Sequence, residues 1–233
     1  MMTLLEIVQE ACKEVGQPRP SVVISATSDT PVRMLSLLNT AGKNLAIEHD
    51  WTALTDVETF TPLAQESQTG HPPADFQKFT SQAAMWDVNN ERPLVGPLPM
   101  DQWMRLVVDA QQNIDKYWTV IGGTIRILPA PAVTDSFTYA YQSKNWVLSA
   151  ALASKAAFTA DDDTPRIDDE LLLLELIWRW KHSIGVDYAE DISNAGRRKE
   201  MVISADRGNR IVSLSKPWDG DIPDTFWPGT ITP

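Results

Sequence analysis

Residues 168–181 read DDELLLLELIWRWK, a run in which three acidic residues precede the longest apolar stretch of the chain. Negative charge near a helix N-terminus interacts favourably with the helix dipole, so the pattern predicts a helix that begins near Asp168. The stretch from Leu171 to Trp180 is apolar around most of a helical circumference. We therefore expect this helix to pack on several sides, against helices from the N-terminal segment and against a neighbouring subunit.

Further helical patterns lie at both ends of the sequence. Thr3 and Glu6 have the spacing of a capping box, and apolar residues follow them with helical period. Thr30 is placed to cap a second helix, with Pro31 at its first position. These helices are expected at residues 3–16, 30–50 and 187–207.

The middle of the chain has a different pattern. β-Branched and aromatic residues occur there in short runs separated by Pro, Gly and Asn, which is typical of strands and turns. The clearest hairpin joins residues 117–121 to 124–128, because Gly122 and Gly123 can supply the positive φ angles of a tight turn. Other expected elements are a strand over 51–60, a hairpin around Asn89 and Asn90, a helix over 99–108 and a strand over 133–141 in the same sheet.

The order of these elements predicts an α+β fold. Helices from the two ends of the chain must meet to bury their apolar stripes, which leaves the strands as a projecting lobe. We expect a helical bundle from residues 1–50 and 165–210, a β-rich antiparallel insertion over 51–164 and an extended tail over 211–233. Four prolines rule out a helix in the tail. Its large aromatic residues either dock on a partner or fold back on the chain; they are Trp218, Phe226 and Trp227.

The charge balance excludes several classes of partner. The net charge is −11, from 31 acidic and 20 basic residues, so the global field repels nucleic-acid phosphates and anionic membranes. Glu175 and Arg179 interrupt the longest apolar stretch, which is shorter than the roughly 20 residues of a membrane span. The N-terminus lacks the basic region of a secretory signal. We expect a protein that stays in the cytosol where it is made, with no membrane contact and no tight nucleic-acid binding.

The sequence shows no pattern typical of a catalytic or metal-binding site. The three histidines, His49, His71 and His182, have no second ligand at metal-binding spacing, and the sequence has no nucleophile elbow or phosphate-binding loop. Cys12 lies among apolar residues and is expected to be a packed, unreactive thiol. The sequence therefore predicts neither a cofactor nor a metal, and a protein that is not an enzyme. A hydrolase that cleaves glycosides with paired carboxylates remains the alternative.

Two charged clusters have alternative interpretations. Asp161, Asp162 and Asp163 form either a solvated acidic loop or a divalent-cation site, but they lack the alternating ligands and central glycine of an EF-hand. The basic cluster Arg197, Arg198 and Lys199 is either a solvated helix face or a contact to acidic residues of another copy of the chain.

The order of features resembles the head-to-tail connector, or adaptor, proteins of tailed bacteriophages, akin to the tail tubular protein A group of short-tailed phages. No matching stretch is a catalytic signature, and it is their collinear order that carries the resemblance. The matching stretches are residues 3–16 with 18–20, 45–51, 73–76, 86–87 with 93–96, 122–123 with 126–129, and 178–181 with 187–191.

The resemblance implies a structural virion protein at the neck. Such adaptors form rings, commonly of about twelve copies, beneath the portal at the capsid vertex, where they join capsid to tail and continue the DNA channel. A lumen lined by acidic residues such as Asp161, Asp162 and Asp163 would repel passing DNA rather than bind it. The aromatic tail would dock on the portal and the β lobe on a downstream tail protein. Another neck or minor capsid protein and a tail-associated peptidoglycan hydrolase are the remaining alternatives.

Overall fold

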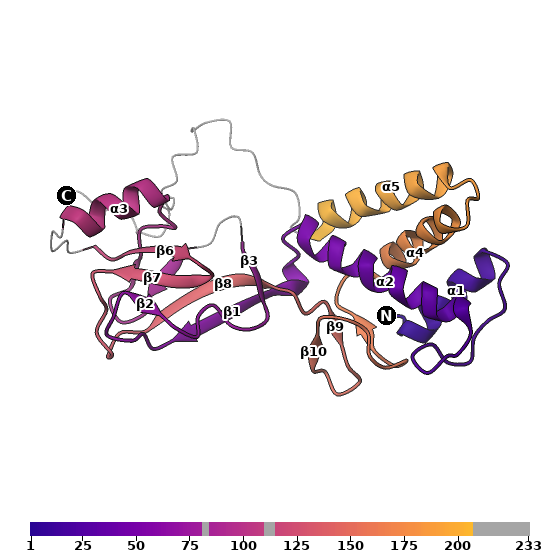
Figure 1. Ribbon diagram of the computed structural model, residues 1–233, viewed down its shortest axis with the longest axis horizontal. Coiled ribbons are helices and arrows are strands. Elements are labelled where there is room, and N and C mark those ends of the chain that lie inside the picture. Colours follow the sequence, from indigo (N-terminus) through magenta and orange to yellow (C-terminus); the bar gives the residue numbers. More distant parts are fainter. Residues whose placement is uncertain (81–83, 110–114, 207–233) are drawn as a thin grey trace, which may run out of the picture.

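Two separate hydrophobic cores divide the chain in the computed structural model, which describes residues 1–80, 84–109 and 115–206. Helices from both ends of the sequence build one core, and strands from its middle build the other. Figure 1 shows the two parts at opposite ends of the long axis. We call residues 1–54 and 144–206 the helical body, and the described residues of 55–143 the β lobe. The fold is α+β, as the sequence predicts.

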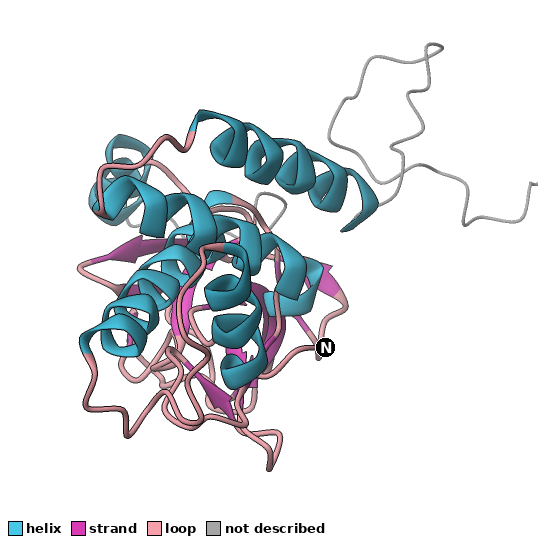
Figure 2. Cartoon of the chain, turned by 90° about the vertical axis from the view of Figure 1, so that its right-hand side faces the viewer, coloured by secondary structure: helices cyan, strands magenta, loops and turns pink. Residues whose placement is uncertain are grey.

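Four helices pack together in the helical body, as Figure 2 shows from the end of the molecule. They are α1 (Leu4–Glu14), α2 (Asp29–Glu48), α4 (Asp169–Ser183) and α5 (Ala189–Asp206). The central helix is α4, which contacts each of the other three. Leu171, Leu172 and Leu176 of α4 are fully buried. The expectation that this helix packs on several sides within the chain is confirmed.

The helix starts show how local signals act. The capping box before α1 is confirmed, because the Glu6 amide donates to the Thr3 hydroxyl at 3.3 Å and the Thr3 amide donates to the Glu6 carboxylate at 2.8 Å. The predicted start of α2 is wrong. Ser28 is its N-cap and the helix begins at Asp29, two residues before the predicted Pro31, and the negative charge of Asp29 in the first turn favours the earlier start. A short 3₁₀ turn, η1 (Thr52–Leu54), follows α2.

Eight strands and one helix form the β lobe. A five-stranded antiparallel sheet has the order β1-β8-β4-β5, with β3 also paired to β8, and a three-stranded sheet has the order β2-β7-β6. The elements are β1 (Thr55–Phe60), β2 (Ser67–Gln68), β3 (Phe76–Phe79), β4 (Met85–Asp87), β5 (Arg92–Pro93), α3 (Met100–Asp109), β6 (Tyr117–Ile121), β7 (Thr124–Leu128) and β8 (Phe137–Ser143).

Three predictions for the lobe are confirmed. Gly122 and Gly123 turn the β6–β7 hairpin with φ of 60° and 76°. The β4–β5 hairpin turns around Asn89 and Asn90, and α3 lies within one residue of the expected helix.

Two strand predictions are wrong in part. The first strand starts only at Thr55, because the residues before it form η1. The strand expected over 133–141 begins at Phe137 and lies in the sheet of β1, not in that of the β6–β7 hairpin. Its alternating aromatic residues share a core with Phe60 of β1, and this contact between distant segments decides its partner.

A third, small sheet belongs to the helical body. Its strands are β9 (Val147–Leu148), β10 (Ser154–Lys155) and β11 (Thr164–Pro165), in the order β10-β9-β11. Trp146 and Phe158 from this segment are part of the helical core. A Cβ at Gly42 of α2 would lie 2.3 Å from the Trp146 ring, so glycine permits the close approach of α2. Packing therefore groups residues 144–167 with the helices, whereas the sequence places the boundary after residue 164.

Candidate functional site

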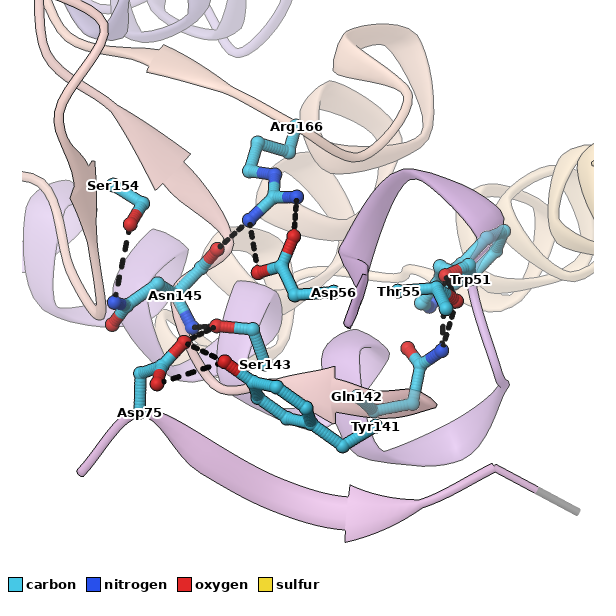
Figure 3. Close-up of polar contacts among 10 residues, drawn as sticks. All are labelled: Trp51, Thr55, Asp56, Asp75, Tyr141, Gln142, Ser143, Asn145, Ser154 and Arg166. Carbon is cyan, nitrogen blue, oxygen red and sulfur yellow. Dashed lines mark hydrogen bonds and ion pairs between the residues drawn. The ribbon is translucent and has the colours of Figure 1, made fainter. Parts of the chain in front are cut away.

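A polar network lies where the helical body meets the β lobe, at the start of β1 and the end of β8 (Figure 3). We call it the joint, formed by Trp51, Thr55, Asp56, Asp75, Tyr141, Gln142, Ser143, Asn145 and Arg166. Gln142 at the end of β8 is fully buried, and its amide nitrogen donates to the carbonyl oxygen of Trp51 at 3.1 Å and to the Thr55 hydroxyl at 2.6 Å. One β8 side chain thus ties the end of the lobe to the turn that leaves α2.

A second contact of the joint is an ion pair between the two parts. The Arg166 guanidinium, just before α4, lies 3.3 Å from the Asp56 carboxylate on β1. It also donates to the carbonyl oxygen of Asn145 at 3.2 Å. Because Arg166 comes from the helical body and Asp56 from the lobe, this pair restrains the orientation of one part relative to the other.

The third contact centres on Asp75, in the loop before β3. Its carboxylate accepts hydrogen bonds from the Ser143 hydroxyl at 2.7 Å and from the Tyr141 hydroxyl at 3.0 Å. Burial, and then the hydrogen bond to Asp75, raise the pKa of Tyr141, so the phenol stays protonated as a donor. The amide of Lys144 donates to the Asp75 carbonyl oxygen at 2.7 Å. The end of β8 is therefore fixed by both the side chain and the backbone of one residue.

The last turn of α5 reaches the edge of the joint. Asp206 accepts a hydrogen bond from the Thr52 amide at 3.0 Å and a second one from the Thr52 hydroxyl. The imidazole of His49 lies 3.5 Å from the same carboxylate. Lys78 of β3 lies 2.8 Å from Asp50. The C-terminal end of α5, beyond which the described chain ends, thus lies beside the junction of body and lobe.

The three aspartates of the acidic loop have separate roles. Asp163 is fully buried, so the solvated-loop interpretation is wrong for it. Burial alone would raise the pKa of its carboxyl, but hydrogen bonds from Lys155 at 2.8 Å and from two backbone amides outweigh this and lower the pKa. Asp161 accepts from the amide of Ile24 at 2.9 Å. Asp162 is exposed.

The basic cluster on α5 is mostly paired within the chain. The guanidinium of Arg198 lies 2.9 Å from both Asp168 and Glu170, and the Lys199 ammonium lies 3.0 Å from Glu48. Arg197 is exposed and, among the described residues, donates only to Asn194 on its own helix, at 2.6 Å. Arg198 and Lys199 therefore attach α5 to the rest of the helical body. A contact of the basic cluster to another copy of the chain stays a prediction.

Comparison with known proteins places these features in a family. The sequence pattern of the family described as SU10 adaptor protein matches residues 2–213. The chain belongs to the SU10 adaptor family. Proteins of the SU10 adaptor family are phage head-to-tail adaptors and structural components of the virion. Among curated proteins, none matches the chain.

Residues 1–80, 84–109 and 115–206 of the SU10 adaptor chain form neither a cation site nor a membrane-spanning helix. In these ranges no three His, Cys, Asp or Glu side chains lie close enough together to hold a metal ion. No helix formed by these residues is both long and apolar enough to cross a bilayer. Cys12 is buried, which raises the pKa of its thiol, and the expectation of a packed cysteine is confirmed. The tail residues Trp218, Phe226 and Trp227 lie outside the described residues.

The joint of this SU10 adaptor was missed at the sequence level. Its only local signal is the end of β8. There the sequence leaves the alternation of aromatic residues and places Gln142 and Ser143, and the structure shows that both polar side chains are buried. Asp75 lies in one of the stretches on which the family resemblance rests, residues 73–76. Its partners are 66 and 68 residues further along the chain, a separation across which sequence spacing carries no information.

Proposed function

We propose that this SU10 adaptor assembles as a ring beneath the portal, joins the capsid to the tail at the virion neck and continues the DNA channel. The observation that carries the proposal is the two-part architecture held by the joint. A ring needs identical subunits that each present the same geometry to their neighbours. A body and a lobe joined by the buried hydrogen bond from Gln142 to the carbonyl oxygen of Trp51 and by the Arg166–Asp56 ion pair meet that need, because they act as one wedge.

The two parts offer surfaces to different partners. We assign lateral contacts between copies to the helical body, where the exposed Arg197 is free to meet acidic side chains of a neighbour. We assign the contact to the downstream tail protein to the projecting β lobe. The portal contact is assigned to the tail of the chain, with Trp218, Phe226 and Trp227 as aromatic anchors.

The channel would pass DNA without holding it. The net charge of −11 favours a lumen that repels phosphate, and Asp162 is the exposed member of the acidic loop. Asp162→Asn should increase the DNA retained in ejecting particles if this loop faces the lumen. Unchanged DNA retention would show that the loop does not line the channel, and it would not contradict the proposed ring.

The ring is tested with purified chain and purified portal assemblies. Mass measurement should find a monomer alone and a closed ring on the portal, of about twelve copies as the family resemblance implies. Deletion of the residues after Leu214 should leave a folded protein that no longer binds portal. A stable small oligomer that does not bind portal would favour another role at the neck. Cleavage of peptidoglycan would favour the hydrolase.

A further inference from the structure

Helix α3 at the far end of the β lobe has an apolar face that is only half covered. Trp103 faces the lobe and is 1% exposed. Met100, Met104, Val107 and Val108 follow the spacing i, i+4, i+7 and i+8, which places them on one side of a helix. They are 54%, 51%, 43% and 77% exposed. We call these four residues the α3 ridge. Their arc continues from Trp103 around the helix into solvent.

Hydrogen bonds and close packing attach the segment before α3 to β6. The Leu98 amide donates to the carbonyl oxygen of Trp118 on β6 at 3.0 Å, and the Thr119 hydroxyl donates to the carbonyl oxygen of Leu98 at 2.8 Å. Gly96 has φ of 153°, and a Cβ there would lie 2.4 Å from the Trp118 carbonyl oxygen. The segment that leads into α3 is thus held tightly against β6, next to the start of the α3 ridge.

We propose that the α3 ridge inserts into an apolar groove of the tail component that the adaptor ring carries; this inference rests on the proposed function. An amphipathic helix with anchors at i, i+4 and i+7 is a recurring way to fill such a groove. Exposed methionines suit the task because their flexible side chains adapt to an imperfect fit. Asp101 and Arg105 flank the ridge with opposite charges, so recognition depends on apolar shape and not on net charge.

Position and size favour this partner over another copy of the chain. The α3 ridge lies at the end of the molecule opposite the helical body (Figure 1), to which we assign the contacts between neighbours. A patch of four such side chains covers on the order of a few hundred Å². A stable pair of proteins buries about 1,200–2,000 Å². The α3 ridge is therefore too small to hold a second copy, but a ring would present it many times to a symmetric tail component.

The test compares two carboxylate variants of the full chain. Met104→Glu with Val108→Glu places charge on the ridge, and Val57→Glu places it on an equally exposed position of β1, 70% exposed. Each variant is added to phage particles that lack the wild-type chain. Electron microscopy then counts the heads without a collar, the heads with a collar and the particles with an attached tail. Urea unfolding checks that both variants fold. A Met104→Leu with Val108→Ile variant should assemble normally, since its face stays apolar.

We expect the ridge variant to give heads that carry the adaptor collar but lack the tail component, with complete particles reduced at least roughly tenfold. Complete particles at the wild-type level would overturn the inference and leave the proposed function intact. Heads without a collar would also overturn it, since the ridge would then act between copies or at the portal. Failure of the wild-type and Val57→Glu chains to join heads would instead count against the proposed function.

Discussion

Helices α1 and α5 both pack on α4, yet they are attached to it in different ways. In α1, five of 11 residues are buried, all of them apolar. In α5, which has 18 residues, Ala195 alone is fully buried, although Val202 and Ile203 pack partly on the core. The side of α5 that faces the body carries charge at most positions. Its members are Asp191, Ala195, Arg198, Lys199, Val202, Ile203 and Asp206.

This difference shows that two neighbouring helices can depend on different forces. Burial of apolar side chains holds α1, and salt has little effect on that contribution. Partly exposed ion pairs contribute much to the attachment of α5; such pairs are worth about 0.2–1 kcal/mol each and are screened by salt. Since α5 is the last described element and ends beside the joint, the weaker attachment belongs to the helix that precedes the proposed portal-binding tail.

The largest effect is expected from the core face of α1. Ile7→Ala removes a fully buried side chain and should lower the free energy of unfolding by about 2–5 kcal/mol, from lost burial and the cavity left behind. Urea unfolding measures it, and the loss should be the same at low and high salt. A loss below about 1 kcal/mol would mean that α1 is not attached through its apolar face.

A smaller loss in the free energy of unfolding is expected from Asp163, a charged residue in the loop that contacts the start of α1. The carbonyl oxygen of Asp163 accepts a hydrogen bond from the amide of Leu4 at 2.8 Å, and the Asp163 carboxylate holds its loop together. Asp163→Asn should cost about 1–3 kcal/mol at pH 7, because the ion pair with Lys155 is lost.

The pH dependence of this loss has a defined sign. The pKa of Asp163 is lowered in the folded protein, so its contribution is present above the unfolded value of about 3.9 and is lost as pH falls through the folded pKa. Unfolding followed from pH 7 to pH 3 should show wild type and Asp163→Asn converging in acid. Asp87, whose pKa is also lowered, is present in both chains and cancels from the difference. A constant gap at all pH values would contradict the assignment.

The ion pairs of α5 are tested by charge reversal at adjacent positions. Arg198→Glu breaks the contacts with Asp168 and Glu170 and should cost about 1 kcal/mol at low salt. Arg197→Glu makes the same charge change at an exposed position whose only partner in the described part of the chain, Asn194, is on its own helix, so it should cost close to nothing. Hydrogen exchange of the α5 amides measures both. Near 1 M salt, where the screening length is about 3 Å, the two variants should become alike.

The elements that local signals encode could be predicted, whereas the contacts that join distant segments could not. The capping box of α1 and the Gly122–Gly123 turn are decided within a few residues, and both are confirmed. The partner of β8 and the hydrogen bonds of Gln142 depend on segments some 80–90 residues away. The burial of Asp163 depends in part on a distant segment, because the carbonyl oxygens of Asp161 and Asp163 accept hydrogen bonds from the first amides of α1.

The smallest effect, and the most specific, concerns the pair of Lys199 on α5 and Glu48 on α2. Lys199→Glu and Glu48→Lys should each cost about 0.2–0.5 kcal/mol, since both side chains are partly exposed. The double variant restores the pair with its charges exchanged and should recover most of the loss. A double-mutant cycle by urea unfolding at low salt isolates this coupling. Additive losses would show that α5 is held here by packing, and the contrast with α1 would then rest on Asp191, Arg198 and Asp206.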